Sequence, residues 1–142
     1  MVTLTPDASV IISALLPEVY TFHSLEFLSY IKSHNINCFM PNIILTEVSA
    51  VLTRQLKSAQ GGNYLQDLTT NEHFHFIDID TSIINSAIRF TRNHKLKGMD
   101  SLYLAIAEIY NCTVVSLDKD QLLASSRKVK VVTPLQVLSR RN

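Results

Sequence analysis

The sequence predicts an α/β fold, a three-layer α/β/α sandwich built around a central parallel, Rossmann-like sheet. Short runs of β-branched and apolar residues, such as 113–117, alternate along the chain with longer segments that repeat apolar residues at helical spacing. This alternation is typical of a parallel sheet with right-handed crossovers. The chain has 142 residues, so we expect one domain, residues 1–142, with its own hydrophobic core.

Five strands are expected, and proline or aspartate marks the end of several of them. Pro6 has no N–H to donate to a ladder and therefore ends the first strand, Pro41 stops the second, and Asp118 follows the fourth. Alternating apolar and polar residues predict the third strand. The expected strands cover residues 2–6, 38–40, 74–79, 113–117 and 129–132.

Helices are expected between these strands, wherever apolar residues recur every three or four positions. Pro17 limits the first helix, and Gly61 and Gly62 break the pattern after the third. Asp80 and Thr81 each offer an N-cap for the fifth. The expected helices cover residues 10–17, 22–33, 43–56, 64–68, 83–91, 100–109, 121–125 and 135–138.

Composition narrows the class of protein. Hydrophobic residues make up 46% of the chain and charged residues 18%, which fits a compact globular protein, and the apolar runs are too short to span a bilayer. The N-terminus lacks signal-peptide features, so we expect a cytoplasmic protein with no membrane partner. A formal net charge of +1 excludes a polybasic protein but not a local basic rim. Cys38 and Cys112 are expected to be free, buried thiols.

Four acidic residues interrupt or end stretches that otherwise have a buried character: Asp7, Glu47, Asp100 and Asp118. Asp7 and Asp118 each follow a predicted strand, and the carboxyl ends of parallel strands form the ligand crevice of open α/β sheets. Asp100 would begin a helix and Glu47 would lie inside one, so only tertiary structure can bring them to this crevice. Unpaired carboxylates are costly in apolar surroundings, which favours a shared explanation.

A divalent ion is the simplest companion for such a cluster. At about 6 Å and an effective dielectric constant near 20, each like-charge pair costs roughly 3 kcal/mol. Mg²⁺ and Mn²⁺ prefer carboxylate and water oxygens, and they commonly bind substrate phosphate as well. An ion held in this way can polarise a phosphoryl oxygen and generate hydroxide from water, as phosphodiester hydrolysis requires.

Each acidic residue also has a purely structural explanation. Taken singly, Asp7, Asp100 and Asp118 are well explained as N-caps, because each precedes a predicted helix. Glu47 alone fits a solvated helix face, and Asp120 either helps to start the following helix or joins the metal site. Their common placement around one predicted crevice favours the shared site.

Four short motifs follow one another along the chain: DASVII at 7–12, TEV at 46–48, GMDSLYLA at 98–105 and SLDKD at 116–120. Together they resemble the acidic motifs of PIN domains. The chain is similar over essentially its full length to the VapC-type ribonuclease toxins of prokaryotic toxin–antitoxin pairs. Ser116 stands in for a usual threonine, and Pro6 replaces the usual apolar residue before the first aspartate.

The resemblance implies a PIN-like sheet, one or two Mg²⁺ or Mn²⁺ ions, an RNA substrate, an antitoxin partner and a homodimer. By the same resemblance, the metal-binding and catalytic residues would be Asp7, Glu47, Asp100 and Asp118. Asp118 would alternatively orient the nucleophilic water. Ser9 and Ser116 would support the carboxylates through hydrogen bonds, or serve only as local caps.

Cationic residues lie near two of the motifs and could hold RNA phosphates, although solvated helix faces are the simpler explanation. These residues are Arg54, Lys57, Arg92, Lys95 and Lys97. Tyr103 could stack a base, but packing in the core explains it more simply. His73 and His75 would share one face of the third strand, yet no third ligand is spaced to complete a zinc site.

The combined interpretation is a Mg²⁺- or Mn²⁺-dependent endoribonuclease, the toxin of a VapBC-type pair. Three alternatives stay open: a catalytically idle PIN-like binding or regulatory module, a free-standing RNA-processing nuclease without an antitoxin, and a phosphoacceptor switch. The last is the least favoured, because receiver domains need an acidic pair at the first strand. Pro6 and Asp7 offer no such pair.

Overall fold

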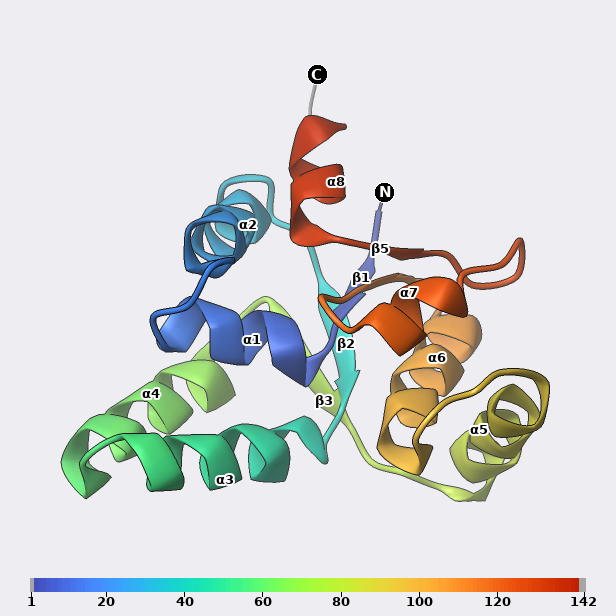
Figure 1. Ribbon diagram of the computed structural model, residues 1–142, viewed down its shortest axis with the longest axis horizontal. Helices are drawn as coiled ribbons and strands as arrows, with labels where there is room; N and C mark the ends of the chain where they lie inside the picture. The colour runs from blue at the N-terminus through green and yellow to red at the C-terminus, as the bar shows by residue number, and fades with distance from the viewer. Residues whose placement is uncertain (1, 141–142) are drawn as a thin grey trace.

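The computed structural model describes residues 2–140 and contains a five-stranded sheet with helices on both faces (Figure 1). The strands are β1 (Leu4–Pro6), β2 (Cys38–Pro41), β3 (Phe74–Ile77), β4 (Thr113–Val115) and β5 (Val131–Val132). They lie in the order β3-β2-β1-β4-β5, and each neighbouring pair is parallel. The strand order reverses between β1 and β4, so the topological switch point of the sheet lies there.

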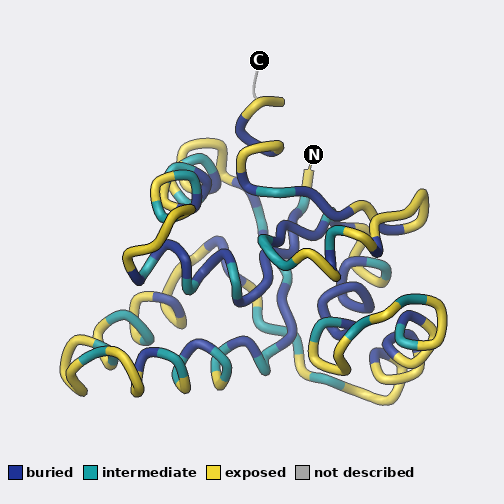
Figure 2. The backbone as a smooth tube through the Cα atoms, in the orientation of Figure 1, coloured by how far each residue is buried: buried dark blue, intermediate teal, exposed yellow. Residues whose placement is uncertain are grey.

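Two groups of helices cover the two faces of the sheet. The helices are α1 (Ala8–Leu15), α2 (Thr21–Ser33), α3 (Ile44–Gln55), α4 (Ser58–Thr70), α5 (Thr81–Asn93), α6 (Gly98–Tyr110), α7 (Lys119–Leu123) and α8 (Pro134–Ser139). The first four lie on one side of the sheet in Figure 1, and α8 packs beside α2 in the same core. Helices α5, α6 and α7 form the core of the opposite face. The strands, α1 and α6 are the most deeply buried elements (Figure 2).

This architecture confirms the predicted fold class and the predicted order of strands and helices. The strands are shorter than predicted at several ends, while Pro6 ends β1 as expected. Cys38 and Cys112 are free and buried, which confirms that prediction. No helix within residues 2–140 combines the length and apolarity that a membrane span requires.

The prediction that Gly61 and Gly62 interrupt the helices is wrong. Both residues lie inside α4, which runs for 13 residues instead of the five expected around Tyr64. Glycine weakens a helix without forbidding it, and tertiary packing supplies the difference. Gly61 faces Leu52 of α3, where an added Cβ would lie 3.6 Å from the Leu52 Cβ atom.

Helix starts explain most of the aspartates that were considered as caps. Asp7, Asp80 and Asp118 are N-caps, and each accepts a hydrogen bond from a backbone N–H in the first turn of its helix. The cap explanation is wrong for Asp100, because α6 begins at Gly98 and places Asp100 in its first turn. The Asp100 carboxylate therefore does not cap the N-terminus of α6.

We expect Gly62→Ala to stabilise the protein by about 1 kcal/mol, because an alanine residue loses less backbone entropy than a glycine residue when the helix forms. At Gly62 that Cβ would meet no atom within 4 Å. Urea denaturation of wild type and variant measures the difference. A loss of stability would contradict the continuous helix and support a break at this point.

Candidate active site

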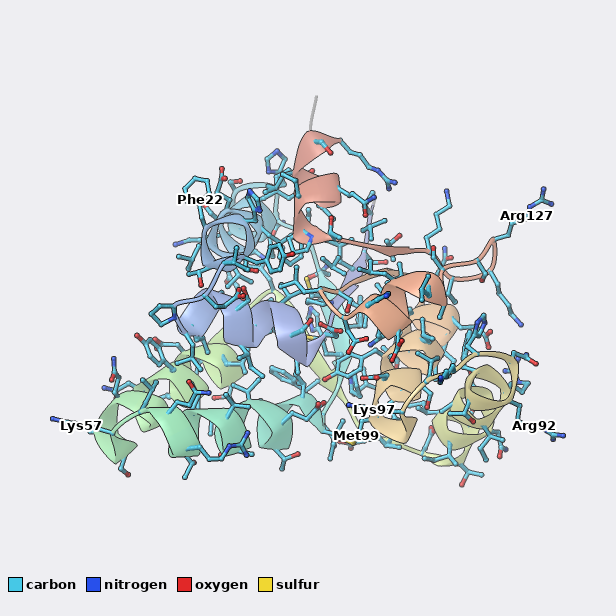
Figure 3. The ribbon with its side chains drawn as sticks, in the orientation of Figure 1. Phe22, Lys57, Arg92, Lys97, Met99 and Arg127 are labelled. Carbon is cyan, nitrogen blue, oxygen red and sulfur yellow. The ribbon has the colours of Figure 1, made fainter. Side chains whose placement is uncertain are left out.

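The four acidic candidates line one cavity at the carboxyl edge of the sheet. Asp7 follows β1 directly and Asp118 lies just beyond β4, while Glu47 and Asp100 occupy the first turns of α3 and α6. Their side chains border a cavity of about 520 Å³. Its remaining lining residues are Ala8, Ser9, Ile12, Lys97, Gly98, Met99 and Tyr103. Lys97 and Met99 lie at the start of α6, facing the middle of the molecule (Figure 3).

Asp7 is the buried centre of this site, with 4% of its surface exposed. Its Oδ1 atom accepts hydrogen bonds from the Ser9 hydroxyl at 2.5 Å and the Val10 N–H at 3.4 Å. Its Oδ2 atom accepts from the Ser116 hydroxyl at 2.5 Å and the Gln121 side-chain amide at 3.3 Å. Burial raises the pKa of Asp7 to about 6, while the hydrogen bonds from Ser116, Ser9 and the Val10 N–H act in the opposite direction.

Ser9 and Ser116 link Asp7 to the segment after β4. The Ser9 hydroxyl accepts a hydrogen bond from the Leu117 N–H at 3.0 Å, and the Ser116 hydroxyl accepts one from the Asp118 N–H at 2.9 Å. Each hydroxyl therefore donates to Asp7 and accepts from the backbone beside Asp118. This pair of relays fixes the position of Asp118 relative to the buried carboxylate.

Asp118 and Asp100 are the acidic residues that line the cavity near α7. Oδ1 of Asp118 accepts from the Asp120 N–H at 2.8 Å and the Gln121 N–H at 3.2 Å. Burial raises the pKa of Asp100, and the negative charge of Asp118 raises it further, while Lys97 acts in the opposite direction. Asp100 and Asp118 thus lie close enough to repel each other.

Glu47 is held by Tyr103, whose hydroxyl donates to Glu47 Oε1 at 2.6 Å. Tyr103 is 1% exposed, so it packs in the core as expected, and it is not available to stack a base. Burial and the Glu47 charge raise the pKa of Tyr103 well above its usual range, which keeps the hydroxyl protonated as a donor. The hydrogen bond between Tyr103 and Glu47 was not predicted. The only sequence signal for it is that Tyr103 lies about one helical turn after Asp100, on the same face of α6.

The cavity suits a divalent ion that keeps part of its water shell. Within residues 2–140, no three His, Cys, Asp or Glu side chains converge closely enough to hold an ion by protein atoms alone. Mg²⁺ is commonly bound through one or two carboxylates together with several waters and substrate phosphate. The donor set consists of carboxylate oxygens that repel one another, and their mutual repulsion favours a cation between them.

The other candidates take several positions. Asp120 is exposed on α7 and contributes to the raised pKa of Asp100. Lys97 borders the acidic cavity, whereas Lys57 borders a separate cavity between α3 and α4. Figure 3 shows Lys57 and Arg92 at opposite outer ends of the molecule, whereas Lys97 lies nearer its middle. Of the labelled cations, only Lys97 therefore lies beside the carboxylates.

The remaining two cations and the histidines lie outside the acidic cavity. Arg54 is exposed in the last turn of α3, and Lys95 follows the end of α5. His73 is buried before β3, and exposed His75 has its Nε2 atom 3.0 Å from Asn37 Oδ1.

Gln121 is a site residue that sequence reasoning missed. It is fully buried in α7, and its side chain reaches Asp7 across 114 positions of sequence. The only local signal is a polar residue at a position of the predicted helix that the core would otherwise fill with an apolar side chain.

Comparisons with known proteins identify the family. The PIN domain family model matches residues 4–125, and the chain therefore belongs to the PIN domain family. A search of curated proteins finds no match.

Three similar solved structures support the fold assignment. FitAcB from Neisseria gonorrhoeae shares 16% identity at a TM-score of 0.71, covering 94% of this chain and 99% of that one. A toxin–antitoxin complex from Klebsiella pneumoniae shares 17% at 0.70, covering 93% and 97%. VapC20 from Mycobacterium tuberculosis, a sarcin–ricin loop cleaving toxin, shares 10% at 0.71, covering 90% and 99%. At these identities the likeness concerns the fold.

The buried Asp7 carboxyl gives the metal-free protein a characteristic pH dependence. Its pKa is about 6 in the folded protein against an ordinary value of 3.8, so the folded state binds this proton more tightly. The contribution of Asp7 to the free energy of unfolding is therefore fully present below pH 4. About 3 kcal/mol of this contribution is lost as the pH rises through 6. We expect Asp7→Asn to remove this loss and to melt higher than wild type at pH 7.5 in EDTA.

Thermal unfolding of both proteins at pH 4.5 and pH 7.5 tests this expectation. Asp67→Asn is the control, because Asp67 is exposed on α4 and borders none of the acidic cavity. Parallel pH dependence in wild type and Asp7→Asn would contradict the burial-driven shift.

Proposed function

We propose that the protein is a Mg²⁺- or Mn²⁺-dependent endoribonuclease and the toxin of a toxin–antitoxin pair. The observation that carries the proposal is the single cavity bordered by Asp7, Glu47, Asp100 and Asp118, with Lys97 at its edge. Membership of the PIN domain family supports it. The similarity to VapC20, a sarcin–ricin loop cleaving toxin, is consistent with an RNA substrate and hence with action in the cytoplasm.

In this mechanism the chain's own residues position the reactants. Asp7, Asp100 and Glu47 would hold the ion, which supplies positive charge to the phosphoryl oxygens and lowers the pKa of water. The hydrogen bonds that fix Asp118 use Oδ1, so Oδ2 can accept a proton from the attacking water and orient it. Lys97 would hold a phosphate of the RNA backbone at the edge of the cavity.

An antitoxin and a second copy of the chain are the partners that this proposal includes. The similar structure from Klebsiella pneumoniae is a toxin–antitoxin complex, which supports a protein inhibitor for this chain as well. A free toxin that cleaves cellular RNA would otherwise arrest its own host. Induced expression of the wild-type protein alone should therefore stop growth, while an inactive variant should not.

We expect Asp100→Asn to abolish RNA cleavage while the fold stays intact, because it removes one carboxylate of the site and relieves repulsion with Asp118. The assay incubates a mixed pool of structured RNAs with wild type, Asp100→Asn and the Asp67→Asn control, in Mg²⁺, Mn²⁺ and EDTA. Cleavage by wild type and control in either metal alone is the expected result. Retained cleavage by Asp100→Asn would refute its role, and no cleavage by any protein would favour a binding module.

We expect Tyr103→Phe to lower kcat by about tenfold, because Glu47 loses the hydroxyl that fixes its carboxylate. The ring stays in place, so core packing is conserved. Steady-state cleavage at saturating RNA measures the effect, with circular dichroism as the check on folding. Unchanged kcat would show that Glu47 needs no such restraint.

A further inference from the structure

Gln121 is a polar residue at a fully buried position, where an apolar side chain is the usual occupant. Its side chain is completely buried, and it is the buried residue of the short helix α7. Its amide Nε2 donates to Asp7, but its Oε1 atom is buried and accepts no hydrogen bond from any residue of 2–140. A buried carbonyl oxygen without a donor destabilises the folded state, so an apolar side chain of the same shape would serve the fold better.

The amide has a clear partner in the site. Asp7 Oδ2 receives the Ser116 hydroxyl at 2.5 Å and Gln121 Nε2 at 3.3 Å, while Oδ1 receives Ser9 and a backbone N–H. Without Gln121, the two serine hydroxyls would be the only side-chain donors to the carboxylate among residues 2–140. The 3.3 Å contact is long, so Gln121 acts mainly through the partial positive charge and direction of its N–H bonds.

We propose that Gln121 is a positioning residue that holds the Asp7 carboxylate in the orientation that binds the divalent ion, an inference that rests on the proposed function. A neutral amide can orient the carboxylate without bringing a second cation that would compete with the metal. Gln121 borders no part of the acidic cavity, so it acts through Asp7 and does not touch the RNA.

This role predicts opposite effects on stability and on metal binding. Gln121→Met keeps the length of the side chain and removes both the donor and the orphaned oxygen. We expect it to melt no lower than wild type in EDTA and to bind Mn²⁺ about five- to tenfold more weakly. Gln121→Glu should bind Mn²⁺ more weakly still, because it places a second carboxyl against Asp7. A purely structural role predicts instead a lower melting temperature with unchanged affinity.

Mn²⁺ titration followed by electron paramagnetic resonance tests the inference without any RNA. The proteins compared are wild type, Asp100→Asn, Gln121→Met and Gln121→Glu. Wild-type affinity that falls in Asp100→Asn and in both Gln121 variants supports the proposal. Affinity that falls in Asp100→Asn but stays at the wild-type value in Gln121→Met overturns it and leaves the metal site standing. No specific binding by wild type would overturn the metal-dependent function and the role of Gln121 together.

Discussion

The buried carboxylate of Asp7 is the constraint on which the site depends. It lies where β1 becomes α1, at the centre of the sheet and beside the reversal of strand order. Ser9, Ser116 and Gln121 all direct donors at it, so one carboxylate connects the start of α1 with the end of β4 and with α7. Burial raises the pKa of Asp7, and the hydrogen bonds from the two serine hydroxyls and the Val10 N–H lower it in part. The ionised form of Asp7 therefore depends on the hydrogen-bond donors around it.

The fold tolerates four neighbouring carboxylates because of where its helices begin. Asp7 and Asp118 are N-caps of α1 and α7, and Glu47 and Asp100 lie in the first turns of α3 and α6. Four helix N-termini therefore face the same cavity, and their partial positive charges favour negative groups there. This compensation is incomplete for Asp100, whose pKa remains raised by burial and by Asp118. A cation between these carboxylates, as proposed, would offset the remaining repulsion.

Local patterns in the sequence were sufficient for the order of elements, and long-range contacts explain what they missed. The short apolar runs identify each strand because each run consists of residues that are adjacent in sequence. The break expected at Gly61 and Gly62 is absent, and Gly61 packs against Leu52 of α3, a contact that local sequence does not reveal. The contacts of Tyr103 with Glu47 and of Gln121 with Asp7 span 56 and 114 positions, beyond the reach of spacing arguments. The acidic candidates were found because carboxylates at strand ends and helix starts are visible locally.

A crystal structure of the protein grown with Mn²⁺ would show whether these carboxylates form one metal site. We expect an anomalous difference peak in the cavity between Asp7 and Asp100, and we expect Asp100→Asn crystals to lack it. A cavity without the peak at millimolar Mn²⁺, or a peak elsewhere on the protein, would rule out a metal site formed by these four side chains.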